Sequence, residues 1–176
     1  DIWRNQFDRI RVDPQGASQA DLTKFYSAMY RASMLPRTFN DVDGRYPAFA
    51  KGSPILTMEE GRDYYEDYSM WDTYRALHPL LNIIDRKRSA DMMNSLVLKA
   101  EQGGWLPIFP CWNSYTAAMI GDHCIAALAD AHIKGVGGFD IRRAYRAMRR
   151  NAFESPADEA DYRNGMGRRA LRSYLQ

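Results

Sequence analysis

Residues 103–151 read GGWLPIFPCWNSYTAAMIGDHCIAALADAHIKGVGGFDIRRAYRAMRRN, and their order of loop, helix, turn and helix decides the fold class. Pro107 and Pro110 exclude a helix from the apolar beginning of this stretch, because proline lacks the amide N–H that a helix interior needs. A helix is predicted over about residues 115–134, where glycines end it, and another over about residues 141–151. This alternation predicts paired helices in two layers, as in an α/α toroid or a helical bundle.

The two predicted helices differ in their apolar pattern. The first is apolar almost all round, which predicts burial on both sides. Its apolar residues are Ala117, Ala118, Met119, Ile120, Cys124, Ile125, Ala127, Leu128, Ala131 and Ile133. The second is basic and amphipathic, with Asp140 as its N-cap and Ile141, Tyr145 and Met148 facing inward. The pattern therefore predicts an inner ring of buried helices inside an outer ring of amphipathic ones.

Helix signals recur before this stretch. Ser18 is the expected N-cap of a helix over about residues 19–33. Two more helices are predicted over about residues 70–84 and from about Arg88 to the glycines at 103 and 104. The His78-Pro79 pair predicts a kink or a boundary within the first of these two helices.

Other segments lack a helical period. Residues 36–64 are rich in turn residues and are expected to form a long loop. Within it, residues 41–44 (DVDG) begin like a calcium-binding loop, but Gly52 stands where that loop needs a glutamate, so a turn is expected. Residues 154–164 are expected to form a polar loop, and residues 167–176 to begin one more helix. No strand pattern competes with the helices, so the predicted fold class is all-α.

The amino-acid composition limits the classes of protein to which the chain can belong. The 176 residues are 45% hydrophobic and 26% charged, which is typical of a globular domain and not of a disordered chain. A net charge of only +2 favours neither nucleic acid nor a membrane surface as a partner, and no apolar run is long enough for a transmembrane helix. The first residues do not resemble a secretory signal and are typical of the interior of a longer chain. Cys111 and Cys124 are expected to be free thiols, although spacing alone leaves a disulfide open.

Several catalytic motifs are missing. The sequence has no G-x-S-x-G elbow, no C-x-x-C or H-E-x-x-H zinc motif and no phosphate-binding loop. The buried helix carries Asp130, for which an ion pair with Arg142, Arg143 or Arg146 is expected, since an unpaired buried carboxylate is costly. His123 lies beside the apolar loop, where it either packs in the core or lines a cavity.

Trp71 and Asp72 combine two functions that sugar recognition needs. An indole offers a stacking face, and an adjacent carboxylate accepts hydrogen bonds from hydroxyl groups. Asp72 and Arg75 also have the i,i+3 spacing of an ordinary helix salt bridge, so the spacing leaves both interpretations open.

Four ordered blocks of sequence resemble one known family. Residues 68–81 (YSMWDTYRALHPLL) resemble its S-x-W-D-T-x-R-A-x-x-P-L segment, and residues 119–135 resemble its M-I-G-x-H and A-D-A-x-x-K-G segments. Residues 106–112 resemble its G-x-x-P-x-x-x-W segment, and residues 36–46 fit a further block. The blocks follow the family's order, so the sequence resembles the catalytic region of the calcium-dependent α-mannosidases of glycoside hydrolase family 92.

The resemblance implies a fold and an activity. It implies part of an (α/α)6 barrel, incomplete over residues 1–176, with no second domain in this chain. It also implies hydrolysis of terminal α-linked mannose, often α-1,2-linked, from glycans by inversion, with a calcium ion that binds the mannose hydroxyls. The partner would be a mannose-containing glycan, and the protein would be secreted, periplasmic or at the cell surface.

The chain departs from the family by lacking the segments that hold its general acid and base. Both are expected beyond residue 176, together with most calcium ligands, so we expect no metal site among these residues and no activity from them alone. What the resemblance transfers is substrate binding: Asp72 as the hydrogen-bond acceptor, Trp71 as a pocket wall, Arg75 to orient Asp72, and Trp112 and His123 at the rim.

Two other functions stay open at this stage. The chain could belong to another helical-barrel glycosidase, which a panel of glycoside substrates would distinguish. It could also be a non-catalytic carbohydrate-binding or structural helical module, which mannose titration would test. In either case, the buried helix over residues 115–134 predicts exposed apolar surface and self-association if its neighbours are absent.

Overall fold

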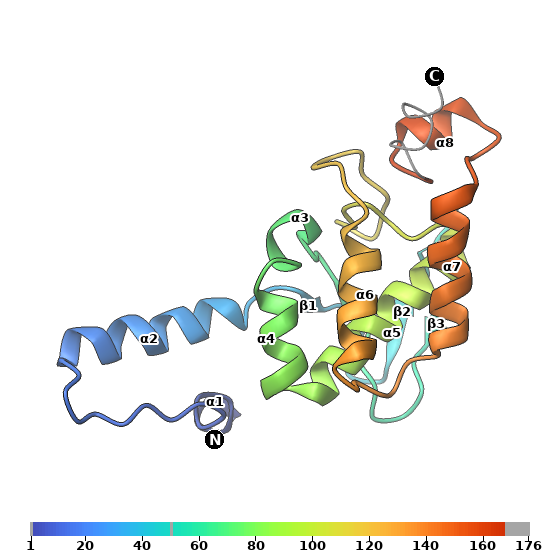
Figure 1. The fold of residues 1–176 in the computed structure, drawn as a ribbon. Helices are drawn as coiled ribbons and strands as arrows, with labels where there is room; N and C mark the ends of the chain where they lie inside the picture. Colours follow the sequence, from blue (N-terminus) through green and yellow to red (C-terminus); the bar gives the residue numbers. More distant parts are fainter. Residues whose placement is uncertain (1, 50, 168–176) are drawn as a thin grey trace. The chain divides into compact units, whose positions relative to one another are not determined.

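The computed structural model describes residues 2–49 and 51–167. The chain divides into two compact units, residues 1–35 and residues 36–176, each described by itself (Figure 1). Apart from its first residue, the helix predicted over residues 167–176 lies outside the described residues.

The first unit consists of α1 (Ile2–Phe7) and α2 (Gln19–Ala32). The α2 helix confirms the helix predicted over about residues 19–33. The Ser18 hydroxyl caps α2 by accepting a hydrogen bond from the amide of Asp21 at 3.2 Å. Aromatic rings join the two helices, with the Trp3 and Tyr30 centroids 4.8 Å apart. No residue of either helix is fully buried, so ring contacts rather than a closed core hold this unit together.

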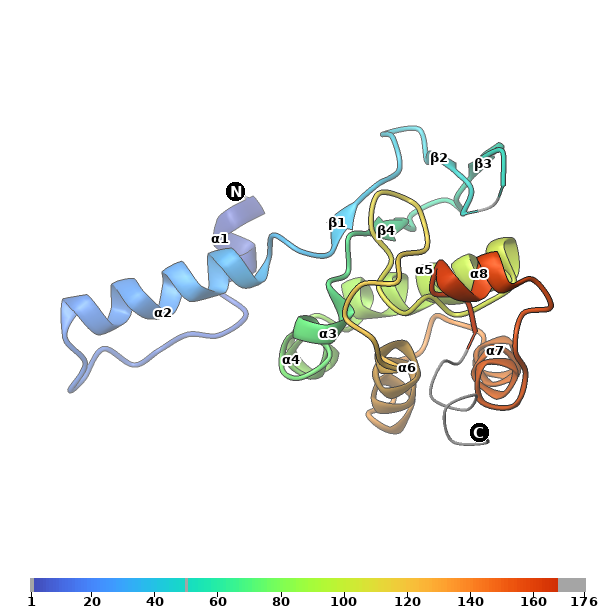
Figure 2. The same cartoon turned by 90° about the horizontal axis from the view of Figure 1, so that it is seen from above.

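The second unit contains a helical layer, which we define as α4 (Leu77–Ile84), α5 (Arg86–Gly103), α6 (His123–Ile133) and α7 (Ile141–Phe153). Figure 2 shows α4, α6 and α7 nearly end-on in a row, with α5 lying across them. Their buried side chains form one core. Its members include Leu81, Met92, Met93, Leu96, Val97, Cys124, Leu128, Ala131 and Ala144.

Helix ends in this layer follow the predicted signals. Asp140 caps α7, because its carboxylate accepts hydrogen bonds from the amides of Arg142 and Arg143 at 2.8 and 3.0 Å. Gly104 ends α5 with φ of 93°, a left-handed conformation that suits glycine. Of the residues expected to face inward from α7, Tyr145 is instead 62% exposed.

The helix predicted over residues 70–84 is divided at a different place from the one expected. It forms α3 (Met70–Thr73) and α4, separated by residues 74–76, and His78-Pro79 lies inside α4. Pro79 is tolerated there because it falls in the first turn, where the backbone N–H has no partner within the helix. The boundary predicted at His78-Pro79 was therefore misplaced by a few residues.

The prediction of a helix over residues 115–134 is wrong for its first part, because α6 begins only at His123. The hydroxyls of Tyr115 and Thr116 donate to the carbonyls of Trp105 and Phe109 at 2.7 and 2.6 Å, which folds this segment back on the preceding loop. Burial on both sides is wrong as well, since Ile133 is 82% exposed. The apolar composition of residues 115–120 reflects a folded-back loop and not a helix.

Three short strands occur within the loop expected over residues 36–64 and a fourth directly follows it, so the prediction that no strand competes with the helices is corrected. β1 (Arg37–Thr38) pairs antiparallel with β4 (Tyr65–Glu66), and β2 (Arg45–Pro47) with β3 (Ile55–Thr57). Strands of two or three residues are too short to show an alternating pattern. The second unit is therefore mainly helical, with two small sheets beside the helices.

The strands, α3 and their connections form a loop layer, which we define as residues 36–76 and 104–122. Figure 2 shows α5 between the strands of this layer and the row of α4, α6 and α7. A further helix, α8 (Glu159–Arg163), lies in the segment predicted to be a polar loop. Cys111 and Cys124 are free, as predicted. Within residues 2–49 and 51–167, no helix combines the length and the apolar character that crossing a bilayer requires.

Candidate functional site

The short helix α3 carries Trp71 and Asp72 and is anchored to the core by its neighbours. The Thr73 hydroxyl donates to the carbonyl of Tyr68 at 2.7 Å. Tyr68 is completely buried, and its hydroxyl donates to the carbonyl of Met92 on α5 at 2.6 Å. The tryptophan and the carboxylate are therefore held on a fixed support, although a helix of four residues is not stable alone.

Asp72 is exposed on α3 and has no ion-pair or side-chain hydrogen-bond partner among the described residues. The salt bridge between Asp72 and Arg75 that the spacing allowed is not formed within that part of the chain. Arg75 instead binds Trp71: its Nε donates to the Trp71 carbonyl at 3.0 Å, and its guanidinium carbon lies 4.1 Å from the indole centroid. The expectation that Arg75 orients Asp72 is therefore replaced by a cation–π contact with Trp71.

A row of stacked groups leads from α3 to the start of α6. The Arg75 guanidinium carbon lies 5.5 Å from the Tyr74 centroid, and the Tyr74 ring stacks on the His123 imidazole at 4.1 Å with an interplanar angle of 14°. Trp71, Arg75 and His123, all predicted from the sequence, are thus brought together through Tyr74, which was not predicted. The signal for Tyr74 was its place in the WDTYR segment.

His123 is held in a confined position. Burial lowers its pKa, and the positive charge of Arg75 adds to this effect, so the imidazole is neutral at pH 7. Its Nε2 is buried without a hydrogen-bond partner among the described residues. The imidazole lies so close to Gly121 that a Cβ there would clash with the ring, which explains why the MIG-x-H segment has a glycine at this position.

Trp112 lies in the loop layer, at the tip of a tight turn. The amide of Ser114 donates to the carbonyl of Cys111 at 3.1 Å, and the two central residues, Trp112 and Asn113, have φ of 53° and 54°. Positive φ at both central positions is typical of a type I′ turn, which usually contains asparagine and glycine. A left-handed conformation costs about 1–2 kcal/mol in a residue with a side chain. Nevertheless, Trp112 is 80% exposed, so no core packing compensates this cost.

Two consecutive carboxylates that the sequence analysis missed hold this turn. The Trp112 amide donates to Asp67 Oδ1 at 3.0 Å, and the Asn113 amide donates to Glu66 Oε1 at 3.0 Å. The Cys111 thiol donates to Asp67 Oδ1 at 3.2 Å, and burial raises the pKa of this thiol to about 11, so it keeps its proton. Acidic residues within the apolar run YYEDY at 64–68 were the available signal, since carboxylates in such surroundings need partners.

Lys99 on α5 completes the buried charged cluster and was also missed. Its ammonium forms an ion pair with Glu66 and donates to the Tyr64 hydroxyl at 2.6 Å, and both charged side chains are completely buried. The ammonium also lies 3.9 Å from the Tyr64 ring centroid and 5.0 Å from that of Phe49. Burial lowers the pKa of Lys99 to about 8 and raises the pKa of Glu66, while their mutual attraction opposes both shifts.

Asp130 does not pair with the predicted arginines of α7. Its carboxylate binds the Lys134 ammonium at 2.7 Å and accepts a hydrogen bond from the Asn82 amide group at 2.8 Å. Lys134 is one helical turn away at i,i+4, and the arginines are on another helix. The predicted type of interaction is correct, and the predicted partners are wrong.

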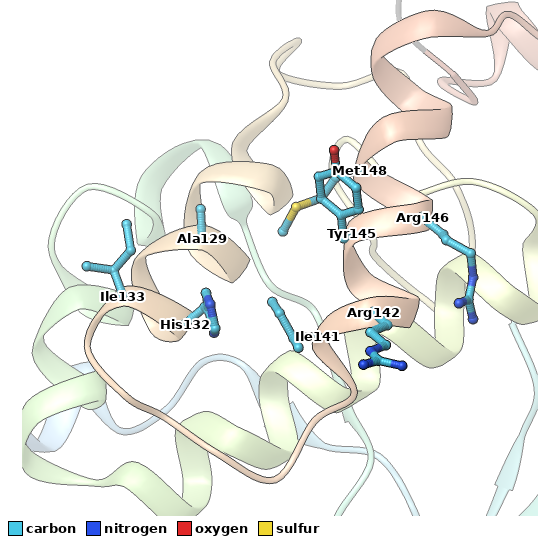
Figure 3. A pocket seen from close by; sticks show the side chains of 8 residues that line it. All are labelled: Ala129, His132, Ile133, Ile141, Arg142, Tyr145, Arg146 and Met148. Carbon is cyan, nitrogen blue, oxygen red and sulfur yellow. The ribbon is translucent and has the colours of Figure 1, made fainter.

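The described cavities do not coincide with Trp71 and Asp72. An apolar groove of about 570 Å³ runs between α6 and α7 (Figure 3). Its lining residues are Ala129, His132, Ile133, Ile141, Arg142, Tyr145, Arg146 and Met148. A second cavity of about 560 Å³ is more polar, and Asn113, Ser114 and Tyr115 from the loop layer contribute to its wall.

Metal binding by these residues alone has no structural support. Within residues 2–49 and 51–167, no group of three or more His, Cys, Asp or Glu side chains is placed to hold a metal ion. Asp41 and Asp43, where the sequence begins like a calcium loop, lie in a turn: the Gly44 amide donates to the Asp41 carbonyl at 2.9 Å, and Asp43 Oδ2 pairs with Arg45 Nε at 2.6 Å.

The sequence model of the glycosyl hydrolase family 92 catalytic domain matches residues 1–176. Among solved structures, a family GH92 α-mannosidase from Bacteroides thetaiotaomicron is 33% identical, with a TM-score of 0.77 over 92% of this chain and 21% of that chain. That mannosidase has also been solved in complex with mannoimidazole. A family GH92 inverting mannosidase from the same organism is 26% identical, with a TM-score of 0.82 over 98% of this chain and 22% of that chain.

The chain therefore spans about a fifth of the length of these solved structures. Comparison with curated proteins gave no match.

Proposed function

The chain belongs to glycosyl hydrolase family 92, and on this premise we propose that it supplies part of the substrate pocket of an α-mannosidase. The substrate is a glycan with terminal α-linked mannose, and α-1,2-linked mannose is the linkage that we propose. One similar structure is an α-mannosidase that was solved with mannoimidazole, which supports this class of substrate.

One observation carries the proposal: Asp72 is an exposed carboxylate beside an indole, on a helix that buried residues hold in place. A carboxylate without a partner among the described residues is free to accept hydrogen bonds from two neighbouring hydroxyl groups. An Asp72 buried in an ion pair with Arg75 would have had no such capacity. The arrangement therefore favours sugar binding over a structural role for this residue.

The neighbouring side chains have complementary roles in the proposal. Trp71 is 41% exposed while Arg75 covers one face of its indole, which leaves the rest of the ring to contact the apolar face of a hexose. Arg75 acts through Trp71 and not through Asp72. Trp112 and the neutral His123 border the pocket, and Tyr74 joins His123 to α3 by stacking.

The chemical step belongs to residues outside this chain in our proposal. We place the general acid and the general base beyond residue 176, in the part of the family 92 structures that the chain does not cover, so the 176 residues alone are proposed to be inactive. An inverting mechanism is supported by the description of one similar structure as an inverting mannosidase. Inversion requires the two carboxyl groups to be far enough apart to admit a water molecule.

Calcium is part of the proposal only for the complete protein. The described residues include no group of three or more His, Cys, Asp or Glu side chains placed to hold a metal ion, so these residues do not by themselves fit a calcium ion. We propose that the calcium ligands lie elsewhere in the protein, and no step of binding by Asp72 or Trp71 depends on the ion.

The architecture and location are also proposals. We infer that the helical layer is part of an (α/α)6 barrel and that both compact units belong to one helical catalytic domain. We propose secretion, or a periplasmic or cell-surface location, where glycans are accessible. Self-association through exposed apolar surface stays a prediction.

The test is the variant Asp72→Ala in the full-length protein, assayed on α-1,2-mannobiose and on an aryl α-mannoside. Loss of two charged hydrogen bonds should raise the free energy of the transition state enough to lower kcat/KM at least about 100-fold. Each tenfold decrease in kcat/KM corresponds to roughly 1.4 kcal/mol of lost transition-state binding. Glu60→Ala, which removes an exposed carboxylate from another loop, is the matched control and should retain activity. Full activity of Asp72→Ala would remove the proposed role of this residue.

A substrate panel separates the proposal from related activities. The full-length protein should cleave α-mannosides and leave α-glucosides and α-galactosides intact. Preferential cleavage of another glycoside would replace mannose as the proposed sugar, and absence of any glycosidase activity would favour a carbohydrate-binding or structural module.

A further inference from the structure

The turn that carries Trp112 is strained and exposed at the same time. Trp112 and Asn113 both have positive φ, and so do Asp67 and Ser69 in the segment that binds the turn, with φ of 58° and 45°. Backbone conformations of this kind persist only when surrounding contacts enforce them, and they cluster at ligand-binding sites. Folding gains little from an indole that is 80% exposed, so the strain points to a role outside the core.

Asp67 makes the contacts that enforce the conformation of Trp112. Its Oδ1 accepts hydrogen bonds from the Trp112 amide at 3.0 Å and from the Cys111 thiol at 3.2 Å. Its Oδ2 accepts a hydrogen bond from Arg37 Nε at 2.8 Å. Burial would raise the pKa of Asp67, but the donors from Trp112, Arg37 and Cys111 outweigh burial and lower it. The carboxylate is therefore charged at neutral pH and saturated with donors.

A second set of contacts fixes the other half of the turn independently. The Asn113 amide binds Glu66, which forms the buried ion pair with Lys99 of α5. The Asn113 side chain donates to the carbonyls of Pro47 and Ala48 at 3.0 and 3.1 Å. Because Asn113 is tied to the core in this way, the contacts of Asp67 act on the backbone of Trp112, whose side chain is exposed.

The same carboxylate links Trp112 to α3. Asp67 precedes Trp71 and Asp72 by only a few residues, and the Tyr68 amide between them donates to the carbonyl of Pro110 at 3.3 Å. In Figures 1 and 2 the loop that contains the turn lies beside α3. A shift of Asp67 would therefore change the position of Trp112 relative to the Trp71–Asp72 pair.

We propose that Asp67 is a positioning residue for substrate binding. It holds the backbone of Trp112 in its strained conformation and thereby places the Trp112 indole at the border of the mannose pocket. This inference rests on the proposed function, because it assigns to Trp112 a contact with the sugar or with the unit next to it. The chemical class that such an indole binds is the apolar face of a pyranose ring. Asp67 itself does not touch the substrate.

The test is a double-variant cycle in the full-length enzyme on an α-mannoside substrate. Trp112→Ala and Asp67→Ala should each raise KM roughly tenfold and change kcat by less than about twofold, because both remove binding that is equal in the ground state and the transition state. If Asp67 acts through Trp112, the double variant Asp67→Ala with Trp112→Ala should have the KM of Trp112→Ala alone. Asp67→Asn, which keeps an oxygen acceptor for the Trp112 amide, should retain most of the affinity.

Amide hydrogen exchange supplies a readout that does not depend on activity. Asp67→Ala should accelerate exchange in the peptide that contains residues 110–114, and Glu60→Ala should leave that exchange unchanged. Three results would each overturn the inference. The first is unchanged exchange in Asp67→Ala, and the second is a double variant in which the two increases in KM multiply. The third is a Trp112→Ala enzyme with an unaltered KM. Failure of the proposed function is distinguishable, because the parent enzyme would then cleave no α-mannoside while exchange at residues 110–114 still responded to Asp67→Ala.

Discussion

The helical layer and the loop layer are held together by different interactions. In the helical layer, apolar side chains of α4, α5, α6 and α7 fill one core, and the charged groups of these helices lie mostly at its edges. In the loop layer, the carboxylates of Glu66 and Asp67 are buried and bind backbone amides that are distant in the sequence, and Glu66 also pairs with Lys99 of α5. The first layer depends on burial of apolar surface, and the second adds satisfied buried charges to its apolar contacts.

This difference coincides with the distribution of candidate functional residues. Trp71, Asp72, Arg75 and Trp112 lie in the loop layer, and His123 is the first residue of α6 next to it. Buried ion pairs and hydrogen bonds impose one geometry on an irregular backbone, because any shift leaves a charge unpaired. We therefore infer that the helical layer supplies stability and that the loop layer sets the positions of the binding groups. Three predictions test this division.

The largest effect is expected from Lys99→Ala, which removes the α5 partner of Glu66 in the loop layer. Removal of the ammonium leaves the Glu66 carboxylate buried without its partner, which should lower the free energy of unfolding by about 3–5 kcal/mol. Urea unfolding at pH 7 measures this change. The double variant Glu66→Gln with Lys99→Met is the control, because it removes both charges and should regain most of the loss. A loss below about 1 kcal/mol for Lys99→Ala would contradict the description of the loop layer.

A somewhat smaller effect is expected from Leu128→Ala in the helical layer. Leu128 on α6 is completely buried, and its truncation should lower the free energy of unfolding by about 3 kcal/mol through lost burial and the cavity left behind. Ile133→Ala, in the same helix but at an exposed position, should change it by less than about 0.5 kcal/mol. Equal losses in the two variants would show that another part of the protein covers Ile133.

The smallest effect concerns the one histidine that is buried inside the helical layer. Neither ring nitrogen of His78 has a hydrogen-bond partner among the described residues, and burial lowers its pKa to about 4. The unfolded chain, with a pKa near 6.5, then binds a proton that the folded chain rejects. Stability is therefore fully present above about pH 6.5 and should fall by roughly 2–3 kcal/mol as the pH decreases towards 4.

The measurement is urea unfolding of the protein and of His78→Gln at several pH values across this window. Comparison of the two removes the contribution of carboxylates, because these titrate in both proteins. The slope against pH should be smaller in His78→Gln. An identical slope would mean that His78 has a partner in the complete protein and is not an unpaired polar group of the helical layer.

Much of the helical structure in both units was predictable because its signals are local. The α2 helix, the caps Ser18 and Asp140, and the end of α5 at Gly104 follow from residues that are near one another in the sequence. The error at residues 115–122 has the opposite origin. Their apolar composition fits a helix, but in the structure Tyr115 and Thr116 hydrogen-bond to the preceding loop and Met119 has a positive φ of 49°. At this position, tertiary contacts outweigh the intrinsic helix propensity of the residues.

The candidate site was predictable in part, for the same reason. Trp71, Asp72, Arg75, Trp112 and His123 were selected from short motifs, and the structure places Trp71, Arg75 and His123 in one stacked row. The linking residue Tyr74 and the holding residues Glu66, Asp67 and Lys99 were missed. Each of the three holding residues acts through a contact across more than 30 residues of sequence, from Lys99 to Glu66 and from Asp67 to Trp112.

The sequence by itself determined most of the helices, the caps and the family, since each depends on the identity and order of nearby residues. Only the tertiary structure decided which charges are buried, which partner each charge has, and that Arg75 binds Trp71 while Asp72 stays unpaired among the described residues. The physical reason is that the cost of burying a charge depends on all groups around it, and chain folding brings those groups from distant positions.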